Sequence, residues 1–432
     1  MKFPARFLLP GLLMPVLFAH PQTTSPSATG SQDTGQASPF QIEDVEVASH
    51  GRAGMPAPVL GADGVLRMSW VERHGGGEAR LLLSTFGEDG FGPPHEVARG
   101  DDWFVNWADF PTTSALADGS LLAVWMRMLG EGTFAYGIQF SLSHDGGTSW
   151  SDPAWLHDDL TPAEHGFVSI VPLDESRFMA LWLDGRDSTT AREFRAAGAT
   201  ETEPGAQQLW SRTIGSDGTL GIEMPVDDRV CDCCGTSLVR TGTGEVVAAW
   251  RDRSEGEVRD IYSARFDGKT WSRGQRVHRD NWVIPGCPVN GPRLAWGQGR
   301  LACAWHTGGE TMGSFVALGA DADSGIRPAE KGARFGLPSG LDNGTSAGRV
   351  DALFLSDGSL LVTWMEHAED EVLWRGRLID RKGRSGPPQT IAPTSSDRAT
   401  GFLRAAPFGD GALLAWTDPD SGTVLAAMLT LN

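Results

Sequence analysis

The sequence predicts an all-β chain folded as a β-propeller of four-stranded blades, with seven blades favoured and six as the alternative. The main observation is a repeat: a short apolar strand, a turn usually containing Asp-Gly, and a second apolar strand that ends in Trp. The composition agrees, because 55 Gly and 26 Pro in 432 residues suit short strands joined by tight turns. Four short strands per unit, repeated at a regular period, are typical of propeller blades.

Seven copies of this unit follow one another along the chain. Their terminal tryptophans lie 52 to 68 residues apart and are Trp70, Trp125, Trp182, Trp250, Trp305, Trp364 and Trp416. Each unit continues with a third and a fourth strand, except that the chain ends at Asn432 before the last unit has a fourth. Residues 42–49, IEDVEVAS, form a strand-like segment ahead of the first unit. We expect this segment to complete the last blade and close the ring, which removes open sheet edges.

The amino terminus indicates export. Lys2 and Arg6 precede an apolar run from Phe7 to Phe18, and a small residue, Ala19, ends it. Twelve residues are too few to span a bilayer as a helix. The expected organisation is therefore a signal peptide over 1–19, a flexible linker over 20–38 and the propeller over 39–432, in a secreted or periplasmic protein.

The charge balance excludes some partners. With 36 basic and 55 acidic residues the formal net charge is −19, which disfavours nucleic acid and anionic membrane surfaces. Beyond the amino terminus, no apolar stretch approaches membrane-spanning length. We expect a monomer that takes a small molecule, a glycan or a metal ion at the mouth of the propeller.

Cysteine-containing loops give the sharpest local signal. Cys231, Cys233 and Cys234 precede the inner strand of the fourth unit, and Cys287 precedes that of the fifth. The repeat therefore predicts that the four sulfurs converge in a metal-binding or redox-active centre, and with an imidazole such as His306 they would suit copper or zinc. The alternative is a structural disulfide from Cys287 to one of the other three, which export permits. Cys303 lies within an apolar strand and is expected in the core.

A charged loop lies beside the cysteines. Arg251, Arg253 and Arg259 stand close together with Glu257. Guanidinium groups grip carboxylates in pairs of hydrogen bonds, so this loop is a candidate pocket for an anion, with Glu257 orienting one arginine. The alternative is a solvated loop whose charges pair among themselves.

One turn carries a family resemblance. Ser143 to Trp150, SHDGGTSW, matches the Asp-box pattern S-x-D-x-G-x-x-W, and ARFDGKTW, with Asp267 and Trp271, is similar but one residue shorter. The chain thus resembles the sialidase-like propellers with Asp-box (BNR) repeats. The stretches NWADFP, VCDCCGTS, RDRSEGEVRDI and NWVIPGCPVNGP are similar to those of an exported branch of that family. The resemblance to this exported branch implies the fold and no particular activity.

A sialidase resemblance also implies a glycosidase mechanism: three arginines hold the sugar carboxylate, a Tyr paired with Glu attacks, and an Asp is the acid and base. The chain departs from it, since no Phe-Arg-Ile-Pro motif opens the first unit and Tyr136 and Tyr262 are its only tyrosines. A divergent exo-glycosidase acting on an anionic sugar through the three arginines, or through Asp109 and Glu310, is one alternative to the cysteine centre. A non-catalytic propeller that binds a glycan or a protein is the other.

Overall fold

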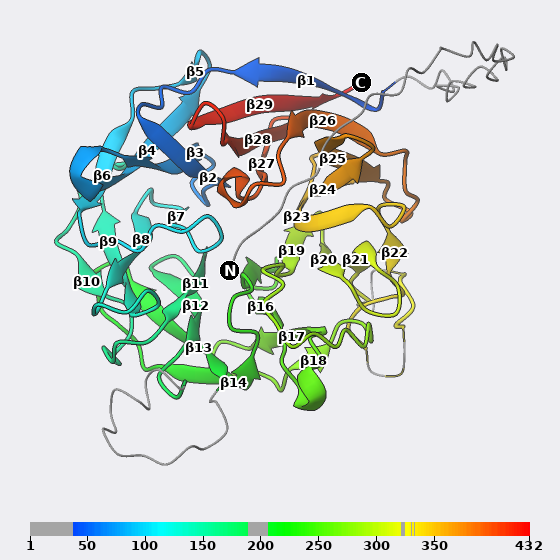
Figure 1. The fold of residues 1–432 in the computed structure, drawn as a ribbon, viewed down its shortest axis with the longest axis horizontal. Helices are drawn as coiled ribbons and strands as arrows, with labels where there is room; N and C mark the ends of the chain where they lie inside the picture. The colour runs from blue at the N-terminus through cyan, green and yellow to red at the C-terminus, as the bar shows by residue number, and fades with distance from the viewer. Residues whose placement is uncertain (1–37, 189–205, 321–324, 330, 332) are drawn as a thin grey trace, which may run out of the picture. The chain divides into compact units, whose positions relative to one another are not determined.

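The computed structural model describes residues 38–188, 206–320, 325–329, 331 and 333–432. The predicted signal peptide, and the linker except for Ser38, lie outside these residues. Within the described residues, seven antiparallel sheets form the seven blades of a propeller, arranged in a ring (Figure 1). The seven-bladed prediction is therefore confirmed.

The strands of blades one to three follow, in chain order. Blade one contains β2 (Arg52–Leu60), β3 (Leu66–Arg73), β4 (Ala79–Gly87), β5 (Gly90–Phe91) and β6 (His95–Gly100). Blade two contains β7 (Thr112–Ala115), β8 (Leu121–Met128), β9 (Tyr136–Ser143) and β10 (Ala154–Trp155). Blade three contains β11 (His165–Pro172), β12 (Arg177–Asp184), β13 (Gln207–Gly215) and β14 (Met224–Val230).

The strands of blades four to seven complete the ring. Blade four contains β15 (Ser237–Arg240), β16 (Val246–Arg251), β17 (Ile261–Phe266) and β18 (Gln275–Arg276). Blade five contains β19 (Arg293–Gly297), β20 (Arg300–Thr307), β21 (Gly313–Leu318) and β22 (Ser339–Gly340). Blade six contains β23 (Ser346–Phe354), β24 (Leu360–Ala368), β25 (Glu371–Ile379) and β26 (Gln389–Thr394). Blade seven contains β27 (Arg404–Phe408), β28 (Gly411–Asp418), β29 (Thr423–Leu431) and β1 (Phe40–Val45).

The described helices are three single 3₁₀ turns, Gly75–Gly77, Glu255–Glu257 and Arg398–Thr400. In the part of the chain that the structure describes, no helix is both long and apolar enough to cross a bilayer.

Strand β1 closes the ring as expected. It pairs antiparallel with β29, with Phe40 opposite Leu431 and Val45 opposite Ala426. The first and last segments of the propeller thus share one sheet, in which β1 is the outermost strand.

The repeated tryptophans lie at the interfaces between blades. All seven are in second strands, and their exposed fractions range from 0% to 5%. Seven apolar clusters each join residues of two neighbouring blades; for example, one combines Trp182 of blade three with Leu122 and Ile138 of blade two. In three blades the indole N–H donates to an acid two residues later, as in Trp182 to Asp184 at 2.8 Å and Trp364 to Glu366 at 2.8 Å. The same pairing joins Trp70 to Glu72 at 3.2 Å.

The connectivity separates two ends of the ring. In an antiparallel blade, the turns between strands one and two and between strands three and four lie at one end. The loops between strands two and three, and those from one blade to the next, lie at the other, which we call the mouth end. The cysteine loops, the Arg251–Arg259 segment, Asp109 and Glu164 all fall at the mouth end.

Candidate functional site

The cysteine loop leads from β14 of blade three to β15 of blade four. Its first residue is fixed by a backbone hydrogen bond from Cys231 to the carbonyl of Arg251, 3.0 Å. Thr236 ends the loop and donates its hydroxyl to the carbonyl of Phe167 at 2.8 Å. These contacts fold the chain back toward the centre, and both Cys231 and Cys234 are only 1% exposed.

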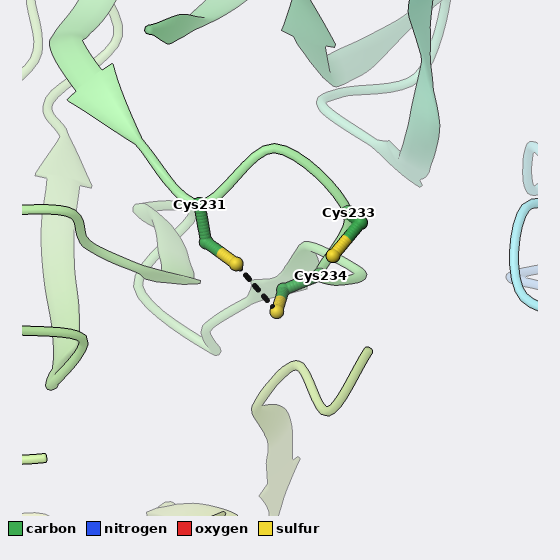
Figure 2. Close-up of side chains that lie close together, drawn as sticks. All are labelled: Cys231, Cys233 and Cys234. Atoms are coloured by element: carbon green, nitrogen blue, oxygen red, sulfur yellow. Dashed lines mark hydrogen bonds between the residues drawn. The ribbon is translucent and has the colours of Figure 1, made fainter. Parts of the chain in front are cut away.

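The sulfur atoms of this loop converge (Figure 2). The Sγ atoms of Cys231 and Cys234 are 2.8 Å apart, and those of Cys231, Cys233 and Cys234 all lie within 4.8 Å of one another. Among the described residues, they form the one group of three or more Cys, His, Asp or Glu ligand atoms close enough to hold one ion. Cys287, from the loop between β18 and β19, forms a disulfide with Cys233 across 54 residues of sequence. The repeat thus correctly placed Cys287 beside the triplet, and the disulfide leaves Cys231 and Cys234 as free thiols.

The two free thiols differ in acidity. Burial alone would raise the pKa of Cys231, but the hydrogen bond from Cys234, the backbone N–H of Cys233 and the charges of Arg251 and Arg259 outweigh it and lower the pKa to about 7. Burial and the neighbouring Cys231 raise the pKa of Cys234 instead. The pair therefore gains one negative charge, on Cys231, as pH rises through about 7, while Cys234 stays protonated.

The arginines of the charged loop are held by contacts within the protein. Arg251 is buried and donates to three carbonyls, those of Asn290 at 2.8 Å, Arg259 at 2.5 Å and His306 at 2.6 Å. Because its donors are used by the backbone, its role here is to tie three segments together and supply positive charge beside the sulfurs.

Glu257 pairs with the other two arginines of the charged loop, Arg253 and Arg259. Its carboxylate accepts from Arg253 at 3.0 Å and from Arg259 at 2.7 Å, and Arg253 also pairs with Asp232 of the cysteine loop at 3.1 Å. Although burial disfavours the charge of Arg259, Cys231 and Glu257 raise its pKa. The loop is thus largely paired internally, and Arg259 also interacts with Cys231.

His306 lies apart from the sulfur group. Its ring meets the edge of Trp282 at 6.0 Å, and its Nδ1 is 3.5 Å from the hydroxyl of Ser314. Burial and the charge of Arg251 lower its pKa to about 4, so the imidazole is neutral. The contact of His306 with the site is its backbone carbonyl, which accepts a hydrogen bond from Arg251. As a metal ligand, His306 stays a prediction.

Asp109 belongs to a second buried cluster. Its carboxyl is 2.7 Å from the hydroxyl of Tyr136, which is also 2.9 Å from Glu164. Burial raises the pKa of Asp109 to about 7 and that of Glu164 to about 8. A hydroxyl carries a single proton, so both contacts can be hydrogen bonds only when one carboxyl is protonated and donates to the tyrosine oxygen. Two carboxyls and a phenol thus share protons in one network near neutral pH.

Sequence reasoning considered Asp109 together with Glu310 and not with Glu164, and it gave Tyr136 no role. The signal was available: Asp109 and Glu164 immediately precede inner strands of adjacent blades, which is the argument that joined Cys287 to the triplet. Glu310, the other acid considered with Asp109, is exposed and accepts from Asn281 at 2.8 Å.

Comparisons with known proteins show the fold alone. No protein-family model matches the chain. No curated protein matches it by sequence. Among solved structures, the BP39L lectin from Burkholderia pseudomallei is similar with a TM-score of 0.60 and 11% identity, covering 88% of this chain and 97% of the lectin. A protein of unknown function from Dyadobacter fermentans aligns with a TM-score of 0.52 and 13% identity, covering 91% and 100%. A sialidase from Trypanosoma rangeli aligns at 0.43 and 9% identity, covering 90% and 59%. The first two likenesses are consistent with a propeller, and none of the three assigns an activity.

Proposed function

We propose that this chain is an exported sialidase-like propeller whose mouth carries a metal-binding thiol centre, with Cys231 and Cys234 as the ligands. The observation that carries the proposal is the 2.8 Å approach of two buried sulfurs from one loop. Thiolates are soft ligands that favour copper(I) and zinc among the biological metals. Export agrees with the amino-terminal pattern and with the metal being acquired outside the cytoplasm.

The number of donors favours copper(I) over zinc. Structural zinc sites use four ligands, whereas two thiolates suffice for copper(I). With Cys233 held by Cys287, two thiols of the group remain. A copper(I) ion bound by two thiolates has one net negative charge, and the cations Arg251 and Arg259 lie near enough to Cys231 to act on its pKa. The site therefore supplies both the ligands and the compensating charge.

Metal titration tests this proposal directly. The full chain, purified anaerobically with its thiols counted before and after denaturation, is titrated with copper(I) against a chromophoric copper(I) chelator. We expect one tightly bound copper(I) per chain, weaker zinc binding, and loss of the copper in C231S and in C234S. Cys303 provides the matched control because it is also a buried free thiol, but it lies in blade five, so C303S keeps the metal. Equal binding by C303S and C231S, or no stoichiometric copper, refutes the site.

The buried carboxyl network favours a second candidate function, that of a divergent exo-glycosidase. Acid and base catalysis at a glycosidic bond uses two carboxyl groups, one of them protonated near neutral pH. Asp109 and Glu164, with Tyr136 between them, offer such a pair. Turnover of fluorogenic sialosides or uronides that is lost in D109N and E164Q would support it. Absence of turnover with this panel counts against it, and absence of both turnover and metal leaves the non-catalytic glycan- or protein-binding propeller.

A further inference from the structure

The central cavity of the propeller holds charge that the site described above does not use. The cavity has a volume of about 390 Å³ and is lined by the inner strands of all seven blades. Its charged lining side chains are Asp109, Arg293 and Arg404. None of the cysteines lines it, so an inference about this cavity stands independently of the thiol centre.

Arg293 has its counter-charge within the protein. Its Nε donates to Asp351 at 2.9 Å, and Asp351 is 1% exposed. The same carboxylate also accepts from the backbone N–H groups of Ala352 at 2.8 Å and Ala405 at 3.0 Å. Both oxygens of Asp351 are therefore occupied, and this ion pair is neutral.

Arg404 differs, because its guanidinium makes no hydrogen bond to any described residue, and its Nη1 is buried without a partner. The guanidinium instead stacks on two rings, 4.7 Å from the centre of Phe402 and 5.2 Å from that of Phe110. Such stacking covers the faces of the group and leaves the N–H donors, which lie in its plane, unused. Burial, with the nearby charge of Arg293, lowers the pKa of Arg404 to about 9, so it still carries its charge at neutral pH.

Asp109 is not the counter-ion, since the charges of Asp109 and Arg404 do not act on each other's pKa. Its two oxygens are engaged by Tyr136 and by the backbone N–H of Phe167, at 2.7 Å and 2.8 Å. A half-buried cation whose Nη1 has no partner, and whose neighbouring carboxylate Asp351 is already paired with Arg293, is costly to hold. The cavity around it has room for more than a water molecule.

We propose that the central cavity binds a small monovalent anion at Arg404, either an inorganic ion or the carboxylate group of a small organic acid. One uncompensated charge on the cavity wall matches one negative charge on the ligand. Arg404, held in place by Phe110 and Phe402, presents its donors with little loss of side-chain freedom on binding. Arg293, already paired with Asp351, adds positive potential without being consumed.

Thermal unfolding of the full chain at constant ionic strength tests the proposal. Chloride, bromide and acetate are each titrated in place of the sulfonate 2-morpholinoethanesulfonate, a monovalent anion that is bulky and is neither a halide nor a carboxylate. We expect a saturable rise of the midpoint with at least one of the three, because a ligand that binds only the native state stabilises it by mass action. A saturable response to acetate alone identifies the organic carboxylate as the ligand chemistry, and a response to halides identifies an inorganic ion.

Two variants and one matched control separate this effect from general salt effects. R404Q removes the charge, and R404M keeps the apolar stem between the two rings; both are expected to lose the saturable rise. R300Q is the control, because Arg300 also stacks on a phenylalanine, 4.8 Å from the centre of Phe354, but donates to the carbonyls of Gly358 and Arg381 and does not line the cavity. It keeps the response.

The position of the ion can be read in crystals soaked in bromide. An anomalous peak within hydrogen-bonding distance of Arg404, absent in R404M, supports the proposal. Unsaturable responses of equal slope in all four proteins, or bromide found at the surface alone as an adventitious ion only, overturns it.

Discussion

At one end of the blades, strands meet in short turns that repeat from blade to blade. Gly64, Gly119, Gly244 and Gly358 hold equivalent positions in four first-to-second-strand turns, with φ of 78°, 84°, 86° and 83°. At the mouth end the loops differ in length and sequence, and they carry the thiols, the arginine loop and the Asp109 network. The turn end is fixed by backbone conformation that glycine allows, whereas the mouth end is fixed by side chains that bind one another. The reactive and charged side chains therefore lie in the loops that differ from one blade to the next.

Neither end supplies most of the stability, and the largest expected effect comes from the interfaces between blades. W364A removes a fully buried indole and its bond to Glu366, and leaves a cavity between blades five and six. We expect a loss of about 3–5 kcal/mol in the free energy of unfolding, measured with denaturant. W364F, which keeps much of the volume, should cost less. Copper binding by the folded W364A protein should be unchanged, and a loss of copper there would show that the mouth depends on packing far from it.

The interfaces are also what the sequence predicts best. Seven tryptophans at the same position of a repeat favoured seven blades, because each blade must bury the same kind of face. The missing fourth strand of the last unit predicted that residues 42–49 complete it, and the strand that does so is β1, Phe40–Val45. The same repeat placed Cys287 beside Cys233. It did not reveal the bond from Trp182 to Asp184, although an acid two residues after the tryptophan recurs in the sequence.

The roles of the mouth residues could not be predicted, because they depend on side-chain directions that a repeat does not encode. Arg251 is one of three similar arginines in the sequence, yet its donors bind three carbonyls. Arg404 belongs to no sequence motif and was not among the predicted site residues, although it is the cavity arginine without a hydrogen-bond partner among the described residues. Composition identifies charged residues, and only the packed loops decide which charges are compensated.

The disulfide is the next largest test, and it lies at the mouth. C287S opens a link between residues 54 apart and is expected to lower the free energy of unfolding by about 2–4 kcal/mol. The denatured thiol count should rise from three, for Cys231, Cys234 and Cys303, to four. A fall in the count, from five to four or from three to two, would mean that Cys233 and Cys287 are not paired in the native protein, whereas C303A should leave the disulfide intact.

The Asp109 network gives the mouth end a pH dependence of its own. Because burial raises the pKa of Asp109 to about 7 from 3.8, the folded state holds a proton that the unfolded state releases between these values. Stability therefore falls as pH rises through this window, by about 2 kcal/mol between pH 5 and 6.5 for one proton. D109N, which stays neutral, should flatten the dependence of the urea midpoint on pH. Equal slopes for D109N and the native protein would contradict the assignment, and E164Q should remove a similar part.

The smallest effect on stability is expected at the turn end. There stability is lost as pH falls, whereas in the Asp109 network it is lost as pH rises. Asp145, between β9 and β10, accepts from the hydroxyl and N–H of Ser149 at 2.6 Å and 2.9 Å and from Ser143 at 2.9 Å, and these bonds lower its pKa to about 2. Its contribution is therefore present above pH 3.8 and is lost as pH falls toward 2.

D145A should lower the thermal midpoint of unfolding at pH 7 by less than W364A or C287S does, and by still less at pH 3. In the shorter copy, Asp267 accepts from the backbone N–H groups of Lys269 and Thr270, and no hydroxyl bond to it is seen among the described residues. D267A is therefore the matched comparison and should cost less than D145A. Copper and anion binding should be unchanged in both, because these turns lie at the end opposite the mouth. A change in either ligand would mean that the two ends are coupled through the blade and do not act separately.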